Sequence, residues 1–567
     1  MHHPKISLYY LPLLIILLLT ACSQKHKKPQ LQQLVSDPAS IDAVVQKNIQ
    51  EQLQFANDNA GKLNDSMHLD FLKVLDKYYE SNDHTALWSS MEKWKPVTAS
   101  LINYLDHAVE DGLFKDDYHF NMISALKQTL DADSLKRMDA VLWTKADLLL
   151  TDACMHILKD LKQGRLQPDS LDWRNSPEKF QSFFAANMDK LVKGESLDSV
   201  FKHAQPIIKR YWLLKSGIKS FIDSMDTKLY TYVSYPYKAT DKNDSIAFVK
   251  KLLKRLSESS FVEKDATVDS QQLASLVKKF QQHKKLNADG KINASFIKQL
   301  NITDIEKYKR IAITLDRYKQ LPDSMPEKYI LVNLPGFYLQ VWDADTVSFT
   351  SKVICGKPAT STPLITSAIS DIVLFPTWTV PTSIIKKEML PALKNNPGYL
   401  ARKGLRLYNN HGDAIDPYSV NWSKYSKGIP YKIQQGSGDD NALGIIKFNF
   451  SNPFDVYLHD TNQRYLFKNS MRALSHGCVR VQDWEKLAFY IARNDSMQVH
   501  AKDTLSYNTD SITNWIATKE RRRIVVKHKM PLFIRYFGCE GINGTIKFYD
   551  DIYDEDKKAK EKFFALK

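Results

Sequence analysis

Two short segments constrain the fold of this chain more than any other feature: Tyr-Leu-His-Asp at 457–460 and Ser-His-Gly-Cys-Val-Arg at 475–480. Apolar and polar residues alternate over 454–460, a period of two that predicts a β-strand. In such a strand, Phe454, Val456 and Leu458 face the core, whereas Asp455, Tyr457 and His459 face the opposite side. The polar stretch 461–474 is expected to be a loop. The second half of the chain must therefore bring a strand and a glycine-containing loop together.

The residue types in these segments suit nucleophilic catalysis. Cysteine is intrinsically a strong nucleophile once a neighbour takes its proton. A free thiol has a pKa near ~8.5, so an imidazole such as that of His459 can raise the thiolate fraction of Cys478. Gly477 permits a close backbone approach or an unusual dihedral angle beside Cys478. The backbone N–H groups of Gly477 and Cys478 are our candidate donors to a developing oxyanion.

Further residues extend this pattern into a family resemblance. They are Thr362-Pro363, Pro376-Thr377-Trp378, Pro381, Asn396-Pro397-Gly398-Tyr399-Leu400, Asn441-Ala442-Leu443-Gly444 and Lys447-Phe448. Together with the two segments, they resemble the L,D-transpeptidases with a YkuD-type catalytic domain, and the large YcbB-like members in particular. The similarity covers most of residues 60–560. It departs from the family at 435–438, where Gln-Gly-Ser-Gly stands in place of a Pro-Gly pair.

The resemblance implies roles for individual residues. Cys478 is the expected nucleophile and His459 the general acid/base, with the backbone carbonyl of Asp460 orienting the imidazole. Tyr457 and Gly477 are expected to border the oxyanion site. The residues expected on the substrate side are Arg480, which holds the site loop or a substrate carboxylate, His476 in a supporting role, and Ser475. The resemblance implies neither a cofactor nor a metal.

The sequence leaves other interpretations of these residues open. His459, His476 and Cys478 are metal-ligand types, so a zinc site is conceivable, although no second close Cys or His-x-x-x-His pair completes it. Three further cysteines, Cys154, Cys355 and Cys539, lie in apolar runs and are expected to be structural. The motif as a whole favours catalysis over a metal site.

The N-terminus predicts export and lipidation. A basic start precedes an apolar run at 11–19, which is short for a membrane span and typical of a signal peptide. The run ends in Leu-Thr-Ala-Cys, which resembles a bacterial lipobox, so we expect residues 1–21 to be removed, Cys22 to be lipidated and residues 22–59 to form a tether. The expected location is the cell envelope, anchored in a membrane and facing the periplasm. A formal net charge of +15 favours anionic partners such as wall carboxylates, and export argues against nucleic acid.

The length and the helical patterns predict a multidomain α+β protein. Apolar residues recur at helical spacing over 60–235, which predicts a helical scaffold domain. Residues 245–303 resemble a small peptidoglycan-binding-like domain, with a tight turn at Asp289-Gly290 before its last helix. Whether this domain binds the wall or only spaces its neighbours stays open. A linker helix is expected over 304–327.

A β-rich catalytic domain is expected over 328–500, with strands at 329–333, 337–342 and 347–355. Residues 384–432 interrupt it with helix, Pro-Gly turns and aromatic residues, which predicts an inserted cap above the groove. Trp422 in this cap is a candidate wall contact. Residues 501–567 are expected to form a C-terminal β-rich extension.

The resemblance implies that the protein is a peptidoglycan L,D-transpeptidase that joins stem peptides by 3→3 cross-links through a cysteine thioester. With water as acceptor, the same site would be an L,D-carboxypeptidase. With an amino acid or a protein as acceptor, it would be an attaching acyltransferase. A non-catalytic, wall-binding structural lipoprotein is the alternative of a different class. The resemblance also implies inhibition by carbapenems through acylation of Cys478.

Overall fold

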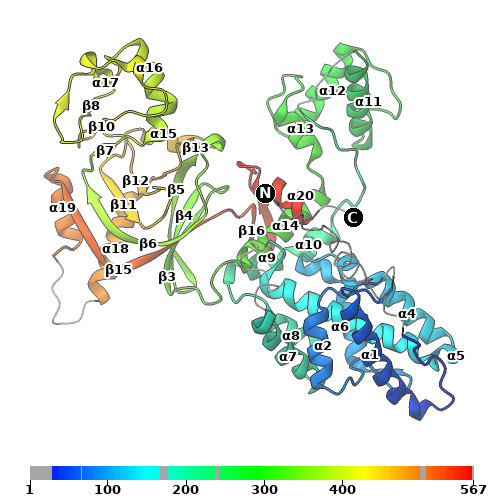
Figure 1. Cartoon of the computed structure of the whole chain (residues 1–567). Helices are drawn as coiled ribbons and strands as arrows, with labels where there is room; N and C mark the ends of the chain where they lie inside the picture. The colour runs from blue at the N-terminus through cyan, green and yellow to red at the C-terminus, as the bar shows by residue number, and fades with distance from the viewer. Residues whose placement is uncertain (1–28, 65–66, 167–176, 236–241, 499–505, 565–567) are drawn as a thin grey trace, which may run out of the picture. The chain divides into compact units, whose positions relative to one another are not determined.

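The computed structural model describes residues 29–64, 67–166, 177–235, 242–498 and 506–564 (Figure 1). The chain divides into two compact units, Met1–Pro206 and Ile207–Lys567. The first unit is mainly helical and the second combines helices with a large β-sheet, which confirms the predicted multidomain α+β class. None of the described helices is both long and apolar enough to cross a membrane. The predicted signal peptide and Cys22 lie outside the described residues.

The first unit is built around one long buried helix, α6 (Ala140–Gln163). Asp139 caps it by accepting hydrogen bonds from the N–H groups of Val141 and Leu142, at 3.0 and 3.3 Å, which satisfies donors that a helix start leaves open. The other long helices are α1 (Ile41–Asp58), α2 (Leu72–Ser81), α3 (Pro96–Asp106), α4 (Phe120–Ala132), α7 (Pro177–Val192) and α8 (Leu197–Ala204). Their apolar sides form one core with α6.

The predicted tether over 22–59 is wrong for its second half, because α1 is a core helix. Ile41, Val45, Ile49 and Leu53 recur at four-residue spacing and are almost fully buried. This spacing gives the helix one apolar stripe, which packs against α2 and α6. The polar residues between them, which suggested a tether, mostly cover the outer face of the helix.

The second unit contains a small helical module with a core of its own, over the range predicted for the peptidoglycan-binding-like domain. Its helices are α11 (Lys242–Glu258), α12 (Ser270–His283) and α13 (Ala294–Asn301). Val277 and Phe280 of α12 are buried in this core. The predicted turn contains Gly290, whose φ of +72° is left-handed and whose added Cβ would lie 3.0 Å from the Ala274 carbonyl, so this position requires glycine.

The largest sheet of the second unit has nine strands in the order β13-β5-β14-β12-β11-β6-β15-β3-β4. The strands are β3 (Lys328–Asn333), β4 (Tyr338–Asp343), β5 (Thr346–Gly356), β6 (Ile365–Leu374), β11 (Ile446–Phe450), β12 (Leu458–His459), β13 (Ala473–Ser475), β14 (Val479–Val481) and β15 (Arg522–Arg535). Because β4 also pairs with β5, the sheet closes on itself as a barrel. Helix α18 (Trp484–Gln498) contributes Leu487 and Ile491 to the apolar core of the sheet.

Strand β15 corrects the predicted domain boundary at 500. It lies inside the sheet, antiparallel to β6 and parallel to β3. Its Ile524, Leu532 and Ile534 are buried in the sheet core. The predicted C-terminal extension therefore contributes a strand to the sheet of the predicted catalytic domain. After β15 the chain adds β16 (Cys539–Ile542), β17 (Thr545–Phe548) and α20 (Glu555–Phe563).

Helix α14 (Asp304–Lys319) is a core helix of the second unit, not a linker as predicted. Its Ile311, Leu315 and Tyr318 are fully buried among residues of the sheet. Helix α9 (Lys209–Ser216) joins the same apolar cluster through Tyr211 and Leu214. The second unit therefore begins before residue 235, where the predicted scaffold ends, because α9 packs with it.

The predicted insertion forms a subdomain with its own sheet and core. The sheet order is β7-β10-β8-β9, with β7 (Trp378–Thr379), β8 (Leu405–Tyr408), β9 (Ala414–Ile415) and β10 (Lys432–Gln435). Helices α15 (Thr382–Ile384), α16 (Leu390–Asn395) and α17 (Tyr399–Arg402) accompany it. Trp422 is 4% exposed in this core, and its indole N–H donates to the Pro417 carbonyl at 2.8 Å. The prediction of a wall contact at Trp422 is therefore wrong, because its ring is structural.

Candidate active site

The parallel pairing of β12 with β14 builds the site. Leu458 lies opposite Val479, and His459 lies opposite Arg480. Leu458 and Val479 are fully buried in the core of the sheet. Successive residues of a strand point to opposite faces, so the residues next to Leu458 and Val479 point away from this core. The side chains that share the other face are those of Tyr457, His459, Cys478 and Arg480. Cys478 lies opposite Tyr457 in this register, so it is two residues away from the position opposite His459 and on the same face of the sheet.

The strand before His459 is shorter than predicted. Strand pairing starts at Leu458, and Asp455 has a left-handed φ of +54°. Phe454 is 57% exposed, so its predicted position in the core is wrong, whereas Val456 and Leu458 are buried. The turn at Asp455 explains this difference because it interrupts the period-two alternation. It also brings the Asp455 carbonyl oxygen 3.8 Å from the Cys478 Sγ.

Burial dominates the electrostatics of the Cys478 thiol and raises its pKa. Hydrogen bonds to the sulfur from the Tyr457 backbone N–H and hydroxyl act in the opposite direction, and so do the positive charges of Lys447 and Arg480. The resting nucleophile at neutral pH is therefore the thiol. The groups around it would nevertheless stabilise a thiolate that forms during reaction.

His459 is buried and neutral. Burial lowers the pKa of its imidazole to about 3, and the positive charges of Arg480 and Lys447 act in the same direction. The nearby backbone of Asp460 and Leu443 acts in the opposite direction on this pKa. In the described part of the chain, the Nδ1 atom has no hydrogen-bond partner. A neutral imidazole is the protonation state that a general base requires.

Three residues of the catalytic loop bond to one another. Gly477 has φ +128°, which glycine adopts readily. Its N–H donates to the Ser475 Oγ at 3.1 Å, and this hydroxyl donates to the Cys478 carbonyl at 2.6 Å. Ser475 is therefore engaged within the loop. The Gly477 N–H is occupied too, which leaves the Cys478 N–H, unbonded within the described residues, as the candidate oxyanion donor.

The two charged residues beside the motif have different surroundings. The Asp460 carboxylate is fully buried, pairs with Arg464 and accepts from the Ile445 N–H at 3.0 Å. Its side chain is thus structural, and the role predicted for its backbone carbonyl stays a prediction. Arg480 donates to Gln463 at 3.1 Å, and its Nε is buried without a partner among the described residues. No carboxylate of the described segments pairs with this guanidinium, which is therefore suited to an anionic ligand.

His476 connects the catalytic loop to the inserted subdomain. Its Nε2 atom lies 2.5 Å from the Glu388 carboxylate. Glu388 belongs to a π-helical turn (Ile385–Met389) between α15 and α16. Both side chains are partly exposed. This pair lies at the edge of the site and places the insertion next to Cys478.

Sequence reasoning missed Lys447 as a site residue, although it was part of the family resemblance. Lys447 lies opposite His459 in the β11–β12 pairing, and its Nζ is 4.0 Å from the centroid of the Tyr457 ring. The signal was available, because Lys447 is the polar residue between the buried Ile446 and Phe448. Within the described ranges, no group of three or more His, Cys, Asp or Glu side chains is arranged to hold a metal ion.

Comparison with known families agrees with this geometry. Residues 327–499 match the family model of the L,D-transpeptidase catalytic domain (YkuD), and residues 73–217 match that of the Scaffold domain. Residues 327–499 are therefore a YkuD-type L,D-transpeptidase catalytic domain, and residues 73–217 are a YcbB-like scaffold domain. It is 31% identical over 261 residues to a Haemophilus influenzae protein named provisionally as an L,D-transpeptidase. That match covers 46% of this chain and 50% of the relative, so the chain spans about half the length of that protein.

Three solved structures also align with 37% of the chain each. They are the avibactam carbamoyl enzyme of Ldtfm (10% identity, 49% of that chain, TM-score 0.17), a Cys-to-Ser mutant of an Enterococcus faecium L,D-transpeptidase (9%, 50%, 0.18) and an L,D-transpeptidase from Mycobacterium smegmatis (10%, 58%, 0.18). TM-scores this low add nothing to the family assignment.

Proposed function

We propose that this protein is a peptidoglycan L,D-transpeptidase that forms 3→3 cross-links between stem peptides through a thioester on Cys478. The observation that carries the proposal is the pairing of β12 with β14, which puts Cys478 and His459 on one face of the sheet. Membership of the family supports the reaction class. The buried, neutral state of His459 supports its role as the base.

The first half-reaction forms the thioester. The Cys478 sulfur attacks the carbonyl carbon after the third residue of a donor tetrapeptide, and the neutral His459 takes the thiol proton. The Cys478 N–H donates to the oxyanion of the tetrahedral intermediate. The bond to the terminal D-alanine then breaks, and the imidazolium gives its proton to the leaving amine.

The second half-reaction forms the cross-link. The side-chain amine of a third-position diamino acid on another stem peptide attacks the thioester carbonyl. The amine proton passes to His459 and from there to the departing Cys478 sulfur, so the free thiol is restored. The product is a 3→3 amide bond.

The charges around the sulfur support an anionic donor. Arg480 and Lys447 both lie close enough to lower the pKa of Cys478. Stem peptides carry free carboxylates, which a guanidinium with spare donors can bind. We assign the substrate carboxylate to Arg480, and a supporting role at the rim to His476.

Product analysis by mass spectrometry tests this function. Native protein incubated with disaccharide tetrapeptides should give dimers that have lost D-alanine, and a carbapenem should add its mass to the protein. Cys478→Ala should do neither. Cys154→Ala removes a buried thiol from the first unit and should retain both activities. Tripeptides without dimers would instead indicate an L,D-carboxypeptidase. Absence of any product with the native protein would refute the proposal and favour a structural role.

We also propose that lipid on Cys22 anchors the protein in a membrane of the cell envelope, facing the periplasm, and that the α11–α13 module contacts the wall. The sequence of the N-terminus supports the anchor. Cys22→Ser should release the protein from membranes into the soluble fraction. Unchanged membrane retention of this variant would contradict lipidation.

A further inference from the structure

The segment that follows β15 reaches the catalytic loop through Tyr553. This side chain is buried, and its hydroxyl donates to the Gly356 carbonyl at 2.7 Å. The same hydroxyl accepts from the Thr362 N–H at 3.3 Å. Gly356 is the last residue of β5, and Thr362 lies near the end of the connection 357–364 that leads to β6. Tyr553 therefore ties the two ends of this connection together.

Thr362 links Tyr553 to the loop that carries Cys478. Its hydroxyl accepts from the Gly356 N–H at 2.9 Å and donates to the Gly477 carbonyl at 2.7 Å. Two further donors of the same connection bond to the Ser475 carbonyl, namely the Lys357 N–H at 2.9 Å and the Thr360 hydroxyl at 3.2 Å. The catalytic loop is thus held through two of its carbonyls by residues 357–362.

The bond to the Gly477 carbonyl has a consequence for the chemistry at Cys478. A trans peptide is planar, so the N–H of Cys478 points opposite to the carbonyl of Gly477. This plane turns about the ψ angle of Gly477, and a glycine has no side chain to restrict that rotation. The hydrogen bond from Thr362 to the Gly477 carbonyl holds the plane in its orientation. That bond aims the Cys478 N–H, the candidate oxyanion donor.

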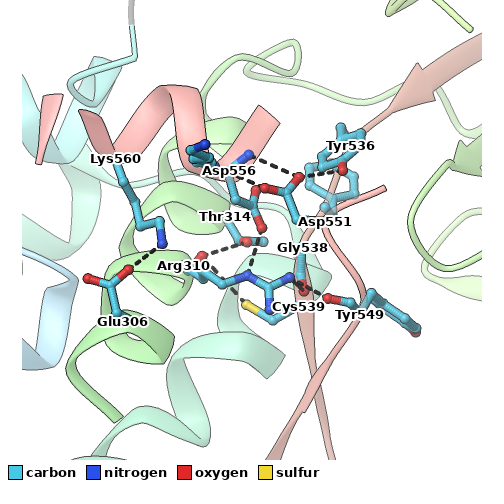
Figure 2. Close-up of polar contacts among 12 residues, drawn as sticks. Glu306, Arg310, Thr314, Tyr536, Gly538, Cys539, Tyr549, Asp551, Asp556 and Lys560 are labelled. Carbon is cyan, nitrogen blue, oxygen red and sulfur yellow. Dashed lines mark hydrogen bonds and ion pairs between the residues drawn. The ribbon is translucent and has the colours of Figure 1, made fainter. Parts of the chain in front are cut away.

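A network of hydrogen bonds fixes the backbone around Tyr553. Its backbone N–H donates to the Tyr536 hydroxyl at 3.0 Å, which donates to Asp551 at 2.6 Å. Figure 2 shows this contact beside Asp556, whose carboxylate bonds to Arg310 of α14 at 2.8 Å. Asp556 also pairs with Arg317 of the same helix. The segment that carries Tyr553 is therefore fixed to a core helix.

We propose that Tyr553 is a positioning residue for acyl transfer: through Thr362 it sets the plane of the Gly477–Cys478 peptide and so aims the Cys478 N–H at the oxyanion. This role rests on the transpeptidase function proposed above. The sequence alone does not suggest this role for Tyr553, because this residue lies more than 70 positions after the motif at 475–480. It touches no reacting atom and acts only through the connection between β5 and β6.

The test is Tyr553→Phe, which removes one oxygen and keeps the ring. We expect kcat for dimer formation to fall by about 10- to 100-fold, since a small misplacement of a catalytic group and the loss of an oxyanion donor cost rates of this order. KM should change less than about twofold, because substrate contacts remain. The matched control is Tyr549→Phe, a tyrosine of the same segment whose hydroxyl pairs with Glu540. This control should keep native kcat.

A second pair of variants separates positioning from folding. Thr362→Val should lower kcat as Tyr553→Phe does, and Thr362→Ser should keep native kcat. The double variant Tyr553→Phe/Thr362→Val should have the same kcat as the less active of the two single variants, because both substitutions act through the bond from Thr362 to the Gly477 carbonyl. Native kcat in folded Tyr553→Phe, or equal losses in Tyr553→Phe and Tyr549→Phe, would overturn the positioning role alone. A native protein that neither cross-links nor is acylated by a carbapenem would overturn the proposed function, and this role with it.

Discussion

The pH dependence of Cys478 alkylation tests the electrostatics of the site directly. Burial raises the pKa of the thiol and lowers that of His459 to about 3, so both groups are neutral between about pH 6 and pH 8. An ordinary thiol with a pKa of ~8.5 is about 3% thiolate at pH 7. The raised pKa of the Cys478 thiol makes its thiolate fraction at pH 7 smaller than this. The alkylation rate follows the thiolate, so it should increase about tenfold per pH unit up to at least about pH 9.

Iodoacetamide labelling, followed by peptide mass spectrometry at Cys478 from about pH 5 to pH 10, measures this profile. The buried Cys154, Cys355 and Cys539 are internal controls that should react only when the protein unfolds. His459→Gln should leave the profile unchanged and abolish turnover, because the resting site contains no thiolate–imidazolium pair. A rate that is flat from about pH 5 to pH 8, and that falls in His459→Gln, would show such a pair and refute the reasoning.

Two further predictions concern stability and backbone geometry. Asp556→Asn should lower the free energy of unfolding by about 3–5 kcal/mol in denaturant titrations, because it leaves Arg310 and Arg317 as buried, unpaired charges. Asp550→Asn, which changes an exposed carboxylate, should shift the free energy of unfolding by less than about 0.5 kcal/mol. Equal effects of the two variants would contradict the role of Asp556 in neutralising the two arginines. Gly477→Ala should lower kcat at least about 100-fold, since φ +128° strains a residue with a Cβ and its relief would move the catalytic peptide. Native turnover in that variant would show that the loop tolerates another backbone conformation.

The position of the catalytic residues could be predicted because their signal is local. Period-two alternation correctly places Val456 and Leu458 in the core, and hence His459 on the opposite face. The turn at Asp455 could not be predicted, because a left-handed aspartate has no distinctive pattern around it. The hydrogen bond that occupies the Gly477 N–H depends on one serine rotamer, which no sequence pattern specifies.

Long-range packing explains the larger differences between the predictions from the sequence and the structure. The apolar runs 524–526 and 532–537 predict strands in the C-terminal extension, but the place of β15 between β6 and β3 depends on partners far away in the chain. An aromatic residue in a polar stretch looks the same whether it packs or binds a ligand, so Trp422 could not be assigned to a core. Likewise, α14 follows a helical module and precedes a sheet, which suggests a linker until its neighbours in space are known.

The central place of β15 implies a particular order of assembly. The barrel cannot close until ribosomes have synthesised this late strand, because it fills the gap between two strands made much earlier. Until then, β3 and β6 each present an open row of backbone groups that invites pairing with other nascent chains. Folding of this domain should therefore depend on holdase chaperones, and early termination should yield aggregates, not a partly active fragment.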